Sequence, residues 1–156
     1  MGSAEAGKAW AAVRKLAAVQ SEAVPFLAGC VEPVPNATAN STKPLIEALD
    51  SDEFRTREAA ATKLVELGPK AEATLRAILA ASRSAEQARR IEDLLIPVEK
   101  IVEPAGGEVR DLRAVAVLRL AGTAEARMIL QELATGVERA NLTREARSTL
   151  AVLNGQ

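Results

Sequence analysis

The chain has 156 residues, 48% of them hydrophobic but only 2% aromatic, and its 20 basic and 21 acidic residues nearly cancel. This balance argues against a binder of nucleic acid or anionic membranes, and the lack of histidine excludes imidazole metal ligands and histidine acid–base catalysis within the chain. A core built from Ala, Leu, Val and Ile suits closely packed helices, so we predict an all-α fold.

The first third of the chain predicts two helices, a loop and a third, short helix. Apolar spacing indicates a helix over 4–19. A second helix follows, which Ser21 caps and which tolerates Pro25 in its first turn. The segment Glu32–Ser41 is rich in Pro and Asn and is predicted to be a loop. A short helix over 44–49 then begins with a proline, which suits a first turn.

The middle third predicts a helix pair and one further helix. The first member runs over 53–67 and is ended by Gly68, and its partner runs over 70–81. A capping-box pattern over 84–87 opens the next helix, which Pro97 is expected to kink or end.

The last third repeats this arrangement. A helix over 108–121 ends at Gly122, and Thr123 caps its partner over 124–134. Thr143 is predicted to cap a final helix. The chain should therefore contain about nine helices, three in each of three units.

An apolar pattern recurs three times along the chain at a spacing of roughly 50 residues. Its equivalent positions are Ala12, Leu16, Val19, Ala23, Leu27, Cys30 and Val31 in the first copy, Ala60, Leu64, Leu67, Ala71, Leu75, Ile78 and Leu79 in the second, and Ala114, Leu118, Ala121, Ala126, Leu130, Leu133 and Ala134 in the third. Such a period is typical of stacked-repeat proteins, whose units do not bury their apolar faces alone. We therefore predict a HEAT/armadillo-like, right-handed α-solenoid.

The predicted domain covers residues 4–154 as a single helical-repeat domain. Residues 1–3 (Met-Gly-Ser) are expected to be a cloning start outside it. The N-terminus lacks the charged-then-apolar design of a secretion signal, which favours a cytoplasmic location, and no apolar stretch is long enough for a membrane span.

The central repeat resembles a HEAT-type repeat. Residues 52–68 carry an acidic residue at the turn, an Arg in the first helical turn, and Ala and Leu at core spacing. The segments 49–60, 121–127 and 142–146 are similar to a helical domain that follows WD-repeat β-propellers in planctomycete bacteria. The resemblance implies a HEAT-like accessory or interaction domain of a larger bacterial protein, and it brings no catalytic residues with it.

The first helix pair departs from this family pattern. Gln20 stands where the turn glycine would be, and Ala9 stands where the Arg would be. The resemblance covers about 9–153, and the central repeat is the part that follows the pattern closely.

Three groups of residues could carry chemistry, and each has a structural interpretation that we favour. Cys30 occupies a core register position and is expected to be a buried hydrophobic residue, not a nucleophile. Asp50, Asp52 and Glu53 lack the spacing of a calcium loop and are expected to cap the following helix. Arginines that could line a concave nucleic-acid surface are Arg55, Arg57, Arg83, Arg89, Arg90, Arg110 and Arg113. Acidic residues interleave with them, so helix-surface ion pairs are favoured.

The sequence therefore predicts a non-enzymatic protein-interaction or scaffold module. It offers no catalytic, cofactor-binding or metal-ligating set, and the partner is expected to be a protein, a peptide or a neighbouring domain of the parent chain. The segments Glu32–Ser41 and Pro104–Gly107 could add contacts. The alternative is nucleic-acid binding through an arginine-lined face. An enzymatic centre is disfavoured because the repeat positions offer little beyond Ala, Leu, Val and Ile.

Overall fold

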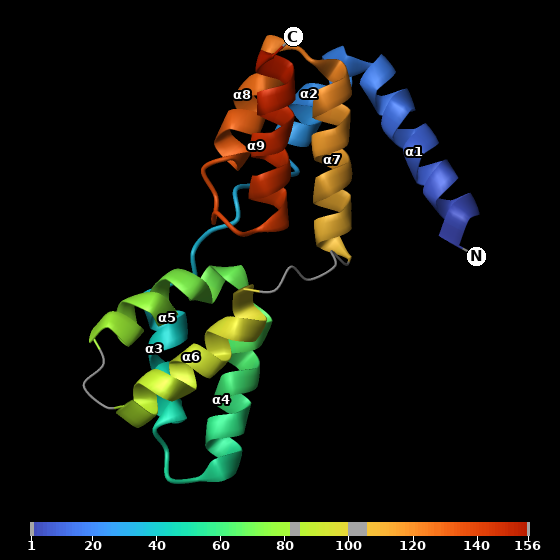
Figure 1. Ribbon diagram of the computed structural model, residues 1–156. Coiled ribbons are helices and arrows are strands. Elements are labelled where there is room, and N and C mark those ends of the chain that lie inside the picture. The colour runs from blue at the N-terminus through green and yellow to red at the C-terminus, as the bar shows by residue number, and fades with distance from the viewer. Residues whose placement is uncertain (1, 82–84, 100–105, 156) are drawn as a thin grey trace. The chain divides into compact units, whose positions relative to one another are not determined.

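The computed structural model describes residues 2–81, 85–99 and 106–155, and all regular structure within these ranges is α-helical (Figure 1). The helices are α1 (Gly2–Ala18), α2 (Gln20–Ala28), α3 (Ala39–Leu49), α4 (Phe54–Leu67), α5 (Pro69–Ala81), α6 (Ala85–Glu99), α7 (Gly107–Ala121), α8 (Ala124–Leu133) and α9 (Asn141–Asn154). The predicted all-α class is therefore confirmed. None of these described helices is long and apolar enough to span a membrane.

Glycines end two of the helices as the sequence predicts. Gly68 follows α4 with a φ of 53°, and Gly122 follows α7 with a φ of 61°. Residues with a side chain rarely adopt such positive φ values, so glycine is the residue that allows the chain to turn into α5 and α8. The pairs α4–α5 and α7–α8 therefore share a positive-φ glycine, although ψ differs: −136° at Gly68 and 8° at Gly122.

The helix α3 begins earlier than predicted. Its first residue lies inside the segment Glu32–Ser41, which the sequence predicts to be a loop. Thr38 is the N-cap, and its Oγ1 accepts a hydrogen bond from the Ser41 N–H at 3.3 Å. The prediction placed Pro44 in the first turn, but this cap lies further upstream and Pro44 is internal to the helix. A cap that satisfies a free N–H can offset the donor that an internal proline lacks.

Of the Ser and Thr caps predicted within the described residues, one is confirmed and two are wrong. Thr123 Oγ1 accepts a hydrogen bond from the Ala126 N–H at 3.1 Å. Ser21 is not a cap because α2 begins before it, and Pro25 consequently lies beyond the first turn. Thr143 is not a cap either, because Ala140 is the N-cap of α9 and leaves Thr143 buried within the helix without a hydroxyl partner.

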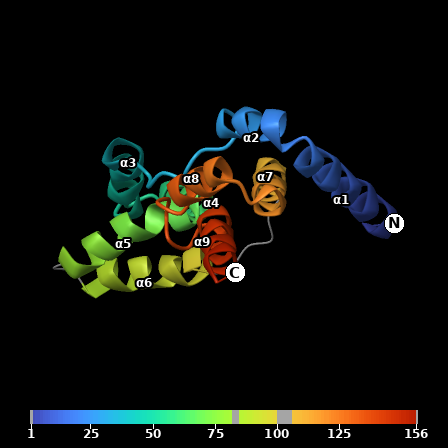
Figure 2. The same cartoon turned by 90° about the horizontal axis from the view of Figure 1, so that it is seen from above.

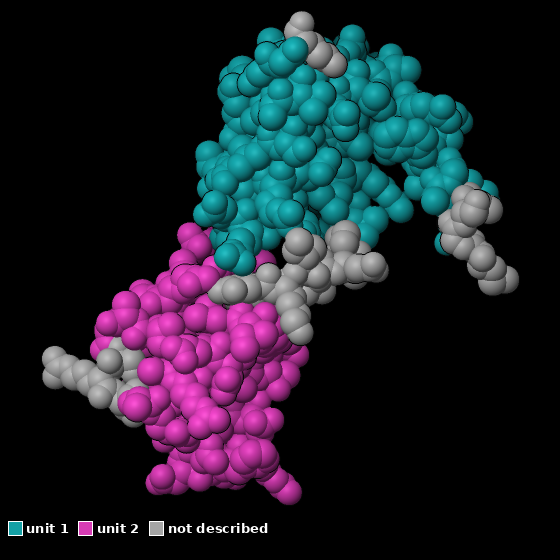
Figure 3. All heavy atoms as spheres, in the orientation of Figure 1, with its two compact units in different colours: residues 1–34, 103–156 teal, residues 35–102 magenta. Residues whose placement is uncertain are grey.

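The helices form two compact units, which Figure 3 shows in different colours. Unit 1 comprises residues 1–34 and 103–156, with α1, α2, α7, α8 and α9. Unit 2 comprises residues 35–102, with α3 to α6. Each unit has a hydrophobic core of its own. The single domain over residues 4–154 stays a prediction.

Unit 1 joins the first helix pair to the third. Helix α1 packs on α7, and α2 contacts both α7 and α8. Helix α9 lies beside α7 and α8 (Figures 1 and 2). In a repeat stack each unit contacts its neighbours in sequence. The contacts within unit 1 instead bring together two pairs that the intervening unit separates in sequence.

Unit 2 is built around the central pair. Helix α3 packs on α4 and contacts α5, while α6 packs on α5 and α4. The core residues come from all four helices, and four of them are fully buried: Leu64, Ala71, Leu75 and Ile91. This core holds α3 and α4 side by side.

The second and third copies of the repeat pattern mark the cores, but the first copy does so only in its second helix. Leu64 and Leu118 have no exposed surface, whereas Leu16, their equivalent in α1, is 42% exposed. Helix α1 instead packs Val13 and Ala17 against the unit 1 core, each one residue beyond the equivalent position of the repeat pattern. The first pair lacks the turn glycine, so its register is set by a different turn.

A close backbone approach fastens the segment after α2 to the turn before α9. The Val137 N–H donates a hydrogen bond to the Val34 carbonyl at 2.9 Å. A Cβ atom on Gly136 would lie 2.6 Å from Thr143 Oγ1 and 2.8 Å from the Val34 nitrogen. Only a residue without a side chain fits here, although its φ is not positive.

Replacing the equivalent leucines of the three repeat copies by alanine should cost more unfolding free energy where the leucine is buried than where it is exposed. We expect Leu64→Ala and Leu118→Ala each to lower the free energy of unfolding by about 2–5 kcal/mol, because each leaves a cavity in a core. Leu16→Ala should cost less than about 1 kcal/mol. Urea unfolding followed by circular dichroism measures all three, and a Leu16→Ala cost equal to that of Leu64→Ala would show that the register of α1 is wrong.

A methyl group at Gly136 should destabilise unit 1. We expect Gly136→Ala to cost about 1–3 kcal/mol, since Val34 or Thr143 must shift to make room. Gly107→Ala is the matched control: no atom of the described residues lies within 4 Å of its Cβ position, and Gly107 opens α7. The control should be neutral or stabilising by up to about 1 kcal/mol in the same unfolding measurement. Equal melting temperatures for Gly136→Ala and wild type would contradict the close approach.

Candidate interaction groove between α3 and α4

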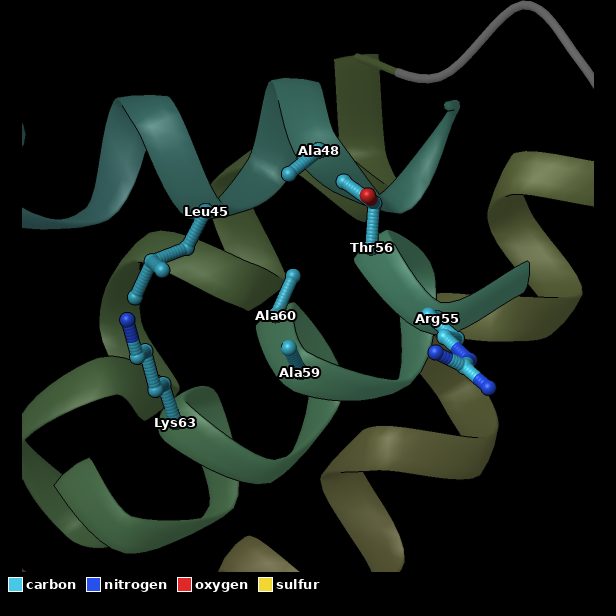
Figure 4. Close-up of a pocket in the computed structure, with 7 residues that line it drawn as sticks. All are labelled: Leu45, Ala48, Arg55, Thr56, Ala59, Ala60 and Lys63. Carbon is cyan, nitrogen blue, oxygen red and sulfur yellow. The ribbon is translucent and has the colours of Figure 1, made fainter. Parts of the chain in front are cut away.

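An open hollow of about 310 Å³ lies between α3 and α4 in unit 2 (Figure 4). It is lined by two residues of α3 and five of α4: Leu45, Ala48, Arg55, Thr56, Ala59, Ala60 and Lys63. We call this hollow the α3/α4 groove. Its volume is at the lower end of the range of about 300–1,000 Å³ that small-molecule sites occupy.

Helical periodicity brings these residues to one side of the two helices. Positions three and four apart share a helix face, which places Arg55, Ala59 and Lys63 in one row along α4 and Leu45 beside Ala48 on α3. Alanine side chains in the middle of the groove leave it open. Ala60 lines the groove and is also a member of the buried core, so the core of unit 2 fixes the groove floor.

Two cations stand along the groove. Arg55 and Lys63 are both exposed, and neither forms an ion pair with another described residue. Eight helical steps separate them, which corresponds to about 12 Å along the axis of α4. Figure 4 shows the Lys63 side chain rising toward Leu45, with Arg55 at the other end of the lining residues.

Two carboxylates near the groove have partners: Glu53 is held by the hydroxyl of the lining residue Thr56, and Glu47 lies outside the groove. None of the lining residues is acidic. Glu53 accepts a hydrogen bond from the Thr56 hydroxyl at 2.7 Å, and on α3 Glu47 pairs with Lys43 at 3.9 Å. The 100° helical step puts Lys43 and Glu47 on the side of α3 opposite Leu45. The groove therefore presents positive charge that is not neutralised among the described lining residues.

Arg57, one of the arginines of the predicted nucleic-acid surface, has a structural role instead. Arg57 Nη1 donates hydrogen bonds to the carbonyls of Ser51, at 2.7 Å, and Asp52, at 2.9 Å. Its guanidinium also lies over the Phe54 ring, 5.7 Å from the centroid. These contacts hold the turn that precedes α4.

Arg90 and Arg110 are also engaged. Arg90 Nη1 donates to the Leu49 carbonyl at 2.7 Å, and its Nε donates to Glu86 at 3.0 Å. Arg110 pairs with Asp111 at 2.8 Å. The remaining arginines of the predicted surface are Arg55, Arg89 and Arg113, which are exposed and have no ion pair with a described residue, and Arg83, which lies outside the described residues.

The acidic turn before α4 does not act as predicted. Glu53 is the N-cap of α4 but makes no side-chain cap hydrogen bond, while its own N–H donates to Ser51 Oγ at 3.2 Å. Asp50 accepts a hydrogen bond from Gln87 Nε2 at 2.9 Å and lies 3.8 Å from Arg90. Gln87 therefore contacts another helix end, and its predicted capping-box partner Ser84 lies outside the described residues. No group of three or more potential metal ligands occurs in the described part of the chain.

Cys30 is exposed, so the prediction of a buried core residue is wrong. Helix α2 ends at Ala28, and Cys30 lies in the turn that follows, where its N–H donates to the Leu27 carbonyl at 2.9 Å. Val31 takes the buried position next to it. The repeat register thus extended the helix too far.

Sequence reasoning named only Arg55 among the groove residues as a candidate for binding, and it placed Ala60 in the repeat core. The row Arg55, Ala59 and Lys63 could have been found once α4 was placed, because two cations flank a small residue at helical spacing. The α3 side could not, since the start of α3 was misplaced. Of the two loops predicted to add contacts, residues 39–41 of the first belong to α3, and Pro104 of the second lies outside the described residues.

Comparison with protein-family models, with curated proteins and with solved structures gives no match to this chain.

Glutamine substitutions should lower the stability of the chain at the two structural arginines but not at the groove arginine. We expect Arg57→Gln and Arg90→Gln each to cost about 1–2 kcal/mol of unfolding free energy, because carbonyls lose charged donors. Arg55→Gln should change stability by no more than about 0.5 kcal/mol. Thermal unfolding measures the three variants. A large loss for Arg55→Gln would give that side chain a structural role and weaken the case for a free groove cation.

Proposed function

We propose that this chain is a non-enzymatic protein-interaction module, and that the α3/α4 groove binds a segment of a partner protein or of a neighbouring domain. The observation that carries the proposal is an apolar floor of Leu45, Ala48, Ala59 and Ala60 between two cations without described partners. Such a surface combines area that gains from leaving water with charge that can select a partner.

The shape of the groove favours a macromolecular partner over a small substrate. Small-molecule sites bury most of their ligand, whereas this hollow is open along two helices (Figure 4). Its lining contains no carboxylate, histidine or cysteine, and its one lysine, Lys63, is exposed to solvent, so the groove offers no paired acid–base or nucleophilic set. The Thr56 hydroxyl already donates a hydrogen bond to the Glu53 carboxylate.

The proposal also covers the repeat unit of the fold, which we take to be a HEAT-like helix pair. The pairs α4–α5 and α7–α8 support HEAT-like helix pairs, because each has a positive-φ turn glycine and a buried Ala/Leu stripe. A right-handed solenoid with three units stacked in chain order is the finer form of this idea, and the packing of α1 on α7 counts against that order. We retain HEAT-like pairs, within a module of a larger bacterial protein of the kind found after WD-repeat propellers.

Photo-crosslinking in lysate of the source organism tests the proposal. A photoreactive amino acid at position 59, in the groove, should cross-link to a defined protein. The same group at position 58 should not, because Glu58 is exposed but does not line the groove. The protein identified at position 59 should then bind the purified chain.

The affinity of the purified partner for two variants of the chain then shows whether the partner binds in the groove. We expect Ala59→Arg to weaken binding at least tenfold by filling the groove, and Glu58→Arg to leave the Kd within about twofold. The lack of any protein adduct specific to position 59, or equal binding by both variants, would rule out the groove as the interaction site. An adduct with nucleic acid would favour the alternative function.

A further inference from the structure

We infer that the partner segment of the α3/α4 groove is an acidic amphipathic helix, with two carboxylates one groove length apart and a small apolar face between them. This inference rests on the proposed function and adds the chemistry of the partner. Three features of the groove carry it: its two cations, the distance between them, and its floor of Leu and Ala side chains.

The charge of the groove sets the sign of the partner. Arg55 and Lys63 are exposed cations without described ion-pair partners, and no acidic residue lines the groove. Glu47 and Lys43 neutralise each other on the other side of α3. A basic segment would meet two like charges here, whereas an acidic one would find both cations available.

The spacing of the cations sets the spacing of the carboxylates. Arg55 and Lys63 are separated by about 12 Å along α4. A helix lying along the groove places residues seven or eight positions apart at nearly the same distance, about 10–12 Å. Glu or Asp at two such positions can therefore meet both cations at once.

The floor favours a helix as the partner's conformation. Groove residues recur at steps of three and four on both helices, as in Leu45 to Ala48 and Arg55 to Ala59 to Lys63. Ridges at these steps are the surfaces into which another helix packs. The side chains facing the floor, between the two carboxylates, should be apolar, as in other helix-in-groove complexes.

The same features disfavour a nucleic acid in this groove. Protein surfaces that bind single strands combine many cations with aromatic side chains on which bases stack. The groove has two cations, and its remaining lining is Leu, Ala and Thr. Arg57 does not add to them, because it is held by backbone carbonyls and the Phe54 ring.

Three synthetic peptides test the inference by fluorescence polarisation with the full chain. The first is an Ala-based helix of about 18 residues with Leu facing the floor and Glu at two positions eight apart. The second replaces both Glu by Gln, and the third replaces both by Lys. We expect the Glu peptide to bind about three- to tenfold more tightly than the Gln peptide at low salt, as two exposed ion pairs allow. This difference should shrink at 1 M salt.

Reversing the charge of the two groove cations should reverse the preference of the protein among the three peptides. The double variant Arg55→Glu/Lys63→Glu should lose its preference for the Glu peptide and bind the Lys peptide best. The control Arg89→Glu/Lys70→Glu changes the net charge equally on exposed residues that do not line the groove. It should keep the wild-type order of affinities. Circular dichroism should show the same helicity and melting temperature for both variants.

Equal binding of the Glu and Gln peptides overturns the inference, and so does binding of none of the three peptides at millimolar concentration. In both cases the proposed function is judged separately, by the position-59 cross-link. An oligonucleotide that binds wild type and is lost in Arg55→Glu/Lys63→Glu also overturns it. Reversal of the preference by the groove variant, with no reversal by the control, supports it.

Discussion

Burial of the Ala/Leu stripe of the helix pairs is the constraint on which the rest of the structure depends. Leu64 and Leu75 in unit 2, and Leu118 and Leu130 in unit 1, have no exposed surface. With almost no aromatic residues available, these aliphatic contacts supply most of the apolar area removed from water. In the pairs α4–α5 and α7–α8, a positive-φ glycine between the two helices lets both apolar stripes face the same core. Formation of the two cores therefore depends on these turn glycines.

That core also determines what the surface can present. Ala60 belongs to both the unit 2 core and the groove floor, so packing of the stripe aligns α3 with α4. Arg57 and Arg90 secure the turns at the ends of these helices by donating to backbone carbonyls. Arg55 and Lys63 make no such hydrogen bonds to backbone carbonyls among the described residues. The proposed interaction function uses the cations that the fold itself does not need.

The sequence predicts the helices and two of the three repeat copies well, because apolar periodicity and turn glycines act locally. It fails where the outcome depends on tertiary packing. Leu16 fits the repeat, yet α1 packs Val13 against the unit 1 core, and Cys30 fits the register, yet α2 ends before it. The pairing of α1 with α7 joins segments far apart in the chain, which no local pattern encodes. For the groove, Arg55 could be anticipated, but the α3 side could not, because Pro44 obscured the true helix start.

Hydrogen exchange of wild type and Leu64→Ala, resolved helix by helix, tests the central claim that each unit is held by its own apolar stripe. The account predicts that Leu64→Ala lowers the opening free energy of amides in α4, α5 and α6, while those in α7, α8 and α9 keep theirs. An equal loss of protection in α4–α6 and α7–α9 would show one shared core and contradict the account.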